Sequence, residues 1–347
     1  MHSSKPRALI AGMAVALALA AGLLGAGGLF DGLASERASA AGGAGAPPLP
    51  PRTPRPTPTP PPAPKPKPVV VPGIAFGASA SAPGPKLEVG APHLAPLREA
   101  MAAEIAAFDV EGYYAVAVTD LQTGESVSVN GDRPQLSGCV LNIFVLLSAL
   151  LDVENAEYSL GSVDDLIAQT LWSSNSWTAR QLYIKTGGGN LYAGLRKVQS
   201  LMVAMGMTKT VVDHPPGYPA ETLGWDPNNW TTADSVNRGL SRIYLGEVLA
   251  EPYRTILLDA MTQVEPALQY ILGTTPGGLV SHKNGWLWED GWADNDAGIV
   301  RFERGGKEYA YAFTFLAMDT RRWKDDVPLA QALVRMAWDH FQAAYPE

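Results

Sequence analysis

The feature that most limits how this chain can fold is a proline-rich tract near its N-terminus. The segment PRTPRPTPTPPPAPKPKP spans residues 51–68, and Pro, Ala, Gly and Thr dominate from residue 41 to about residue 92. Such a composition favours an extended polyproline spacer and buries too little apolar surface to form a core. We therefore expect a disordered linker over residues 41–92 and one folded domain over residues 93–347.

The segment before the linker has the pattern of an export signal. Lys5 and Arg7 precede an uncharged run over residues 8–30, and about 20 apolar residues suffice to cross a bilayer. The positive flank places the N-terminus in the cytoplasm and the rest of the chain outside it. Ala38-Ser39-Ala40 fits a cleavage site, so residues 1–40 are either a signal peptide or a membrane anchor.

Composition excludes several classes of function. The formal net charge is -8 and no dense block of Lys and Arg lies outside the proline-rich tract, so a nucleic-acid partner is not expected. The chain has one cysteine, Cys139, and its five histidines are scattered. This rules out an intramolecular disulfide and offers no spacing typical of a metal site, so we expect neither a metal nor another cofactor.

Residue patterns in the folded part predict strands at both ends and helices between them. We expect a helix over residues 94–109, strands over 113–120 and 126–130, and mostly helices from residue 139 to residue 264. Three further strands, 278–288, 297–306 and 307–319, and a closing helix, 328–345, complete the order. Strands from both ends must then share one antiparallel sheet flanked by helices, an α+β fold of the α/β/α sandwich type.

Three short motifs lie at the start of a predicted helix, in a turn between two helices and on a predicted strand. SGCVLNIFV (137–145) opens the first central helix, Ser173-Ser174-Asn175 lies in a turn between two helices, and Lys283-Asn284-Gly285 lies on a late strand. Together with the early hairpin at 118–132, they resemble the serine β-lactamase and penicillin-binding superfamily, most closely its class A β-lactamase-like branch. The resemblance covers nearly all of residues 95–345.

The resemblance implies a role for each motif. In this superfamily a Ser-x-x-Lys tetrad supplies the nucleophile and its proton acceptor, and it aligns here with Cys139 and Asn142. Backbone N–H groups of the nucleophile and of the residue after the Lys-Thr-Gly triplet form the oxyanion site, here Cys139 and Trp286. The implied catalytic residues are Cys139, Ser173 and Lys283, and the implied substrate-binding residues are Asn175, Asn284, Gly285 and Trp286.

Two departures from the family pattern predict an impaired enzyme. Asn142 cannot accept a proton as the lysine does, and a register starting at Ser137 places Val140 at the lysine position. The loop before Asn229 also lacks the Glu-x-x-Leu-Asn segment whose glutamate activates the deacylating water, and Glu221 is its nearest carboxylate candidate. We therefore expect a domain outside the cytoplasm that binds β-lactams or peptidoglycan stem peptides with little or no turnover.

Other readings stay open at this point. A thiol has a small thiolate fraction at neutral pH even without a base, so Cys139 could act as the nucleophile of an acyl hydrolase or transferase. A Cys139–His282 dyad is disfavoured, because strand alternation sends His282 to the face opposite Lys283. Function could also lie in the linker or in a groove of tryptophans (Trp172, Trp177, Trp286, Trp288, Trp292), and the sequence leaves the oligomeric state undetermined.

Overall fold

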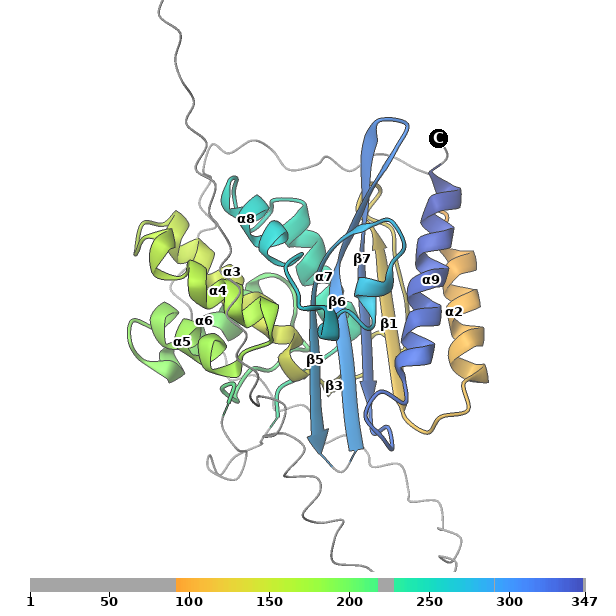
Figure 1. The fold of residues 1–347 in the computed structure, drawn as a ribbon, viewed down its shortest axis with the longest axis horizontal. Helices are drawn as coiled ribbons and strands as arrows, with labels where there is room; N and C mark the ends of the chain where they lie inside the picture. The colour runs from red at the N-terminus through yellow and green to blue at the C-terminus, as the bar shows by residue number, and fades with distance from the viewer. Residues whose placement is uncertain (1–91, 218–227, 290, 346–347) are drawn as a thin grey trace, which may run out of the picture. The chain divides into compact units, whose positions relative to one another are not determined.

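A computed structural model of the chain describes residues 92–217, 228–289 and 291–345. The predicted segment 1–40 and the predicted linker 41–92, apart from Pro92, lie outside these residues. Within them, five antiparallel strands form one sheet in the order β2-β1-β7-β6-β5 (Figure 1). The strands are β1 (Tyr113–Asp120), β2 (Ser126–Val129), β5 (Leu279–Glu289), β6 (Gly291–Arg304) and β7 (Lys307–Met318). Strands β1 and β7 are neighbours, which confirms that both ends of the folded part build one sheet.

One face of the sheet is covered by the first and last described helices. Helix α2 (Ala95–Ala107) and helix α9 (Val327–Ala344) pack side by side there (Figure 1). Alternate residues of the strands, such as Phe313 and Phe315, point towards them and form a core with Leu333 and Phe341. Both helices lie within two residues of their predicted bounds.

The other face carries the helices from the middle of the chain. They are α3 (Asn142–Glu154), α4 (Asp164–Trp172), α5 (Ser176–Thr186), α6 (Leu191–Ala204), α7 (Ala233–Tyr244) and α8 (Tyr253–Ala260). Helix α3 is buried along almost its whole length, as expected for a helix that is apolar on all sides. It packs against α5, α6 and α8 and thus forms the centre of this layer (Figure 1). The result is the predicted α/β/α sandwich.

Short elements connect this layer to the sheet. A two-stranded pair, β3 (Gln135–Leu136) with β4 (Trp230–Thr231), joins the residues before Cys139 to those after the loop that ends near Asn229. The described 3₁₀ helices are η1 (Gly138–Leu141), η2 (Leu160–Ser162), η4 (Pro266–Leu268) and η5 (Leu272–Thr274). Among the described residues, none of the helices has the length and apolar character needed to cross a membrane.

Candidate functional site

Several of the predicted site residues lie where η1 and the start of α3 contact strand β5. A Cβ atom added to Gly285 would lie only 2.4 Å from the backbone nitrogen of Cys139. One added to Gly138, whose φ of 53° is left-handed, would lie 2.9 Å from the nitrogen of Trp286. Only glycine therefore permits this approach. The two backbone nitrogens that the resemblance assigns to the oxyanion site belong to these two touching segments.

Cys139 is a half-buried free thiol near the start of η1. Its sulfur forms no hydrogen bond with any residue in the described ranges. The other register does not provide a nucleophile, because Ser137 is fully buried and its Oγ donates to the Gly138 carbonyl at 3.1 Å. Cys139 is thus the nucleophilic side chain that η1 offers.

Asn142 occupies the place where the family has its proton acceptor. It is the first residue of α3, it is 5% exposed, and its Nδ2 atom has no hydrogen-bond partner. An amide nitrogen donates hydrogen bonds and does not take up a proton. The helix side of the site therefore contains a thiol without an adjacent base.

Lys283 on β5 is the buried cation of the site. Its side chain is fully buried, and Nζ lies 2.6 Å from the Ser174 Oγ and 2.6 Å from the Asn284 carbonyl oxygen. Burial lowers the pKa of Lys283, although the nearby Cys139 and Asp296 act in the opposite direction. No carboxylate among the described residues forms an ion pair with it. The amine is thus held partly towards its neutral form.

The serine that contacts Lys283 is Ser174, one residue after the predicted Ser173. Ser174 is 8% exposed and has a left-handed φ of 53°, which turns its hydroxyl towards β5. Ser173 is exposed instead, and its Oγ donates only a long bond of 3.4 Å to the Gln169 carbonyl. The geometry thus corrects the sequence alignment, because Ser174, and not Ser173, lies in the site.

Asn175 has a structural task that the sequence did not reveal. Its Oδ1 accepts hydrogen bonds from the backbone N–H groups of Trp177 at 2.9 Å and Thr178 at 3.3 Å, which caps the start of α5. The predicted ligand contact of Asn175 would therefore have to come from its remaining amide group. The cap also fixes the turn that holds Ser174.

The other predicted binding residues lie on β5 itself. Asn284 is fully buried, its Oδ1 lies 3.4 Å from the Lys283 Nζ, and its Nδ2 has no partner. Trp286 is half-buried beside Gly138. His282 lies on the opposite face, where its Nδ1 is 2.9 Å from Asp296, as strand alternation predicts.

A buried tyrosine that the sequence does not single out lies within electrostatic reach of Cys139. Tyr183 on α5 is 2% exposed; burial raises its pKa, and the neighbouring Cys139 raises it further.

Three of the predicted groove tryptophans are strongly exposed, whereas Trp292 packs against Trp323 with ring centres 6.1 Å apart. The exposed three are Trp172, Trp177 and Trp288.

The loop expected to hold a deacylating residue is anchored beside Cys139. Glu221, the nearest carboxylate candidate, lies outside the described residues. On the described side, the backbone N–H of Ser137 donates to the Asn229 carbonyl at 3.0 Å, and Asn229 Oδ1 accepts from the N–H groups of Asp213 and His214. In the described ranges no group of three or more His, Cys, Asp or Glu side chains is arranged to hold a metal ion.

Comparisons with known proteins agree with this architecture. The five-stranded antiparallel sheet between helical layers is the fold of the superfamily of serine β-lactamases and penicillin-binding proteins. The sequence model of the beta-lactamase enzyme family matches residues 161–341, which is more than half of the chain. The chain belongs to this family. The match begins after η1, so it does not cover the segment around Cys139.

Solved structures show the same fold at low identity. A beta-lactamase from Chitinophaga pinensis DSM 2588 is 19% identical with a TM-score of 0.61, covering 71% of this chain and 100% of its own. TLA-3 extended-spectrum beta-lactamase is 18% identical with a TM-score of 0.62, covering 72% and 99%. A PBP-A mutant, solved as an acyl-enzyme complex with penicillin G, is 16% identical with a TM-score of 0.61, covering 74% and 100%. No curated protein matches the chain significantly.

Proposed function

We propose that this protein binds β-lactams or peptidoglycan stem peptides in the site between η1 and β5 and turns them over poorly or not at all. The observation that carries this proposal is the thiol of Cys139, which has no hydrogen-bonded base in the described ranges, while Asn142 stands where a proton acceptor is needed. Losing a positioned general base typically costs about 10² to 10⁴ in rate.

Binding has better support than turnover. Lys283 and Ser174 form a connected pair of donors, and the backbone nitrogens of Cys139 and Trp286 lie on touching segments. Ligands of this class carry a carboxylate and an amide or lactam carbonyl, which such donors bind. A mutant of PBP-A, a protein of the same fold, was solved as an acyl-enzyme complex with penicillin G. Replacing catalytic side chains leaves the backbone donors in place.

The neighbouring serines provide a matched test of binding. We expect Ser174→Ala to weaken calorimetric binding of a penicillin about five- to tenfold, because one hydrogen bond is worth about 1 kcal/mol. Ser173→Ala should leave binding unchanged, since Ser173 lies outside the site. Equal effects of the two substitutions, or no binding to the unmodified protein, would defeat the proposal. Hydrolysis of a chromogenic cephalosporin that disappears in Cys139→Ala would defeat the part about turnover.

A second candidate function is acyl transfer through the thiol, and the lowered pKa of buried Lys283 favours it. The Cys139 sulfur would attack the lactam carbonyl while the thiol proton passes to the Lys283 amine. The ring C–N bond would then break, and the ring nitrogen would take that proton. A neutral amine can act in this way, whereas a protonated one cannot.

The reactivity of the thiol separates the two candidates. Thiol-dependent transfer predicts that Cys139 reacts with a disulfide reagent in the folded protein faster than an ordinary free cysteine. A thiol that reacts only after unfolding would exclude this candidate. The binding proposal is compatible with that result, because it needs only the donors of the site.

We also propose that the domain works outside the cytoplasm, either released or tethered by residues 1–40 through the linker. The basis is the charged flank at Lys5 and Arg7 before the uncharged run. Protease added to intact cells should digest the domain, or the medium should contain it. A domain that is protected until the cells are lysed would contradict the proposal. Deleting residues 41–92 would test whether the linker has a function of its own.

A further inference from the structure

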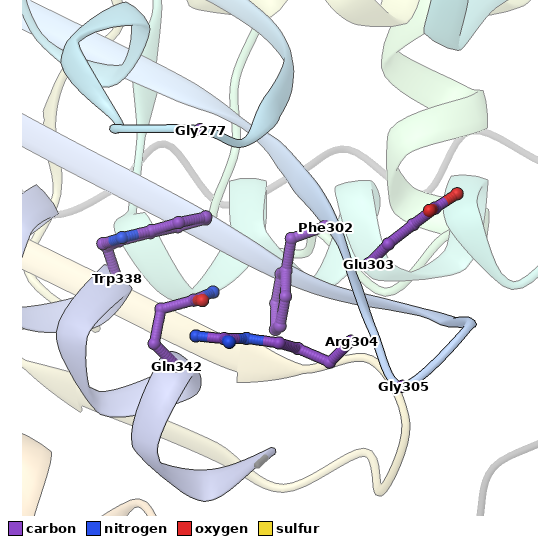
Figure 2. Close-up of a pocket in the computed structure, with 7 residues that line it drawn as sticks. All are labelled: Gly277, Phe302, Glu303, Arg304, Gly305, Trp338 and Gln342. Carbon is purple, nitrogen blue, oxygen red and sulfur yellow. The ribbon is translucent and has the colours of Figure 1, made fainter. Parts of the chain in front are cut away.

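A recess lies away from Lys283, between helix α9 and the turn that joins β6 to β7. Its volume is about 470 Å³, and Figure 2 shows the side chains around it. Phe302 and Arg304 come from β6, Trp338 and Gln342 come from α9, and Gly277 lies on a loop at the rim. We propose that this recess binds a small molecule in which a carboxylate is attached to a flat ring.

Two aromatic side chains give the recess its flat walls. Phe302 and Trp338 contact each other edge to face, with ring centres 5.6 Å apart. Phe302 is held from behind by Tyr309, which stacks on it at 5.8 Å and is itself stacked on Tyr345 at 4.2 Å. Aromatic walls fixed in this way favour a ring that stacks against them or meets them edge-on. They supply the contact for the flat part of the ligand.

The rim beside Trp338 is open because a side chain is missing there. Gly277 has a left-handed φ of 76°, and a Cβ atom on it would lie 3.7 Å from the Trp338 Cζ2. Any larger residue would thus begin to cover the indole ring. The glycine leaves one side of the ring accessible to a ligand.

A buried donor in the recess has no partner. The Gln342 Nε2 atom is buried and makes no hydrogen bond with any described residue. Buried donors are almost always satisfied, so an unsatisfied one needs an explanation. Figure 2 shows the Gln342 amide turned towards the space between Trp338 and Arg304. A ligand oxygen placed there would satisfy it.

Charge around the recess specifies which acceptor fits. Strand alternation places Arg304 on the same face as Phe302, whereas the carboxylate of Glu303 is turned away from Gln342 (Figure 2). Lys307 stands directly opposite Arg304 in the hairpin, but its Nζ lies 5.1 Å from the centre of the Tyr309 ring and it does not line the recess. The recess is thus lined by one guanidinium, that of Arg304, and by the Gln342 amide. A carboxylate matches a guanidinium and an amide donor better than a neutral oxygen does.

The experiment uses the full-length protein and three probes. Benzoate has both the ring and the carboxylate, benzyl alcohol has only the ring, and acetate has only the carboxylate. Titrations followed by NMR would report the side-chain amide signal of Gln342, which the Gln342→Met variant identifies by its loss. Benzoate should shift this signal and bind more tightly than either partial probe.

Two variants decide whether the recess is the site. Gln342→Met keeps the side-chain volume but removes the donor, and it should weaken benzoate binding about five- to tenfold. Asp339→Asn changes an exposed residue of the same helix and should leave the affinity unchanged. Equal binding to Gln342→Met and the unmodified protein would overturn the proposal. Benzoate binding that leaves the Gln342 amide signal unmoved, or no binding at all, would overturn it as well.

Discussion

The two faces of the central sheet bury ionisable groups of opposite charge, Lys283 on one side and Asp294 and Asp326 on the other. Facing the middle helices, Lys283 is fully buried, and its register partner Ala297 belongs to the core on that side. Near the other face, Asp294 and Asp326 are fully buried next to each other. Burial lowers the pKa of Lys283 and raises that of Asp326 to about 8. Each group is thus driven towards its neutral form.

The two faces differ in what surrounds these groups. The Asp294 carboxylate accepts bonds from the Tyr270 hydroxyl at 3.2 Å, the Trp323 indole at 3.1 Å and the Lys324 N–H at 3.0 Å, which ties the segment before α9 to the sheet. Lys283 contacts a single serine from the helical layer and lies near a thiol. The acidic side therefore holds structure together, whereas the lysine side brings together the groups on which the proposed ligand binding rests.

The largest expected effect comes from restoring a base on the lysine side. In a Cys139→Ser, Asn142→Lys double variant, acylation by a penicillin should be about 10² to 10⁴ times faster than in Cys139→Ser alone. The reason is that the new amine stands one turn beyond the nucleophile. Cys139→Ser with Asn142→Leu adds bulk without a base and should show no gain. A folded double variant without a faster burst would show that more than the base is missing.

The next largest effect is expected at the contact between η1 and β5, where a substitution should lower the free energy of unfolding. Gly285→Ala places a Cβ atom 2.4 Å from the Cys139 nitrogen, so one of the two backbones must move. We expect urea unfolding to show a loss of about 2–4 kcal/mol. Gly161→Ala is the control, because a Cβ atom there would meet nothing within 4 Å. Similar losses for both substitutions would contradict the described approach of the two segments.

Asp326 provides a test on the acidic side of the sheet, because its raised pKa predicts the direction in which stability changes with pH. Its folded pKa of about 8 exceeds the ordinary value of 3.8, so the folded state binds more protons, and stability should fall as pH rises from about 4 to 8. Asp326→Asn removes this dependence and should be about 1–3 kcal/mol more stable than the unmodified protein at pH 8.5, with little difference at pH 4. Asp325→Asn should retain the fall. A constant difference across this range would refute the assignment.

The smallest expected effect is a pH dependence of stability caused by His340, a partly exposed residue of helix α9. Burial and the adjacent His93, whose Nδ1 lies 3.0 Å from its Nε2, lower the pKa of His340, while Glu125 and Asp120 oppose this shift. The folded state then binds fewer protons, so stability should fall as pH drops below about 6.5. Because the ring is partly solvated, the loss should stay below about 1 kcal/mol. Thermal unfolding of His340→Gln between pH 7.5 and 5.5 should not show this loss of stability. A pH dependence equal to that of the unmodified protein would contradict the account.

Most of the fold could be predicted because hydrophobic periodicity reports directly on burial. The predicted strand 113–120 is β1 without change, and the predicted helix 328–345 differs from α9 by one residue at each end. Strand β6 begins at Gly291, six residues before the prediction, because its first half carries polar residues such as Asp294 and Asn295. These polar side chains are buried and hydrogen-bonded, so the hydrophobic pattern does not indicate a strand there.

The placement of the candidate site residues could be predicted only where it depends on strand geometry, and not where it depends on a turn or on helix packing. Lys283 and Gly285 lie together on β5 because their spacing on one strand is fixed, and His282 points away as alternation requires. The sequence does not encode which of two adjacent serines adopts the left-handed turn, so it predicts Ser173 where the structure has Ser174 beside Lys283. Tyr183 gave no signal, since its nearness to Cys139 depends on how α5 packs.

The most direct test of the central claim is intact-mass spectrometry of the protein after incubation with a penicillin, alongside Cys139→Ser and Cys139→Ala. The account predicts no covalent adduct on the unmodified protein, together with calorimetric binding that Ser174→Ala weakens. An added penicilloyl mass that Cys139→Ala abolishes would contradict it. Such a result would establish that the segment SGCVLNIFV still carries a working nucleophile.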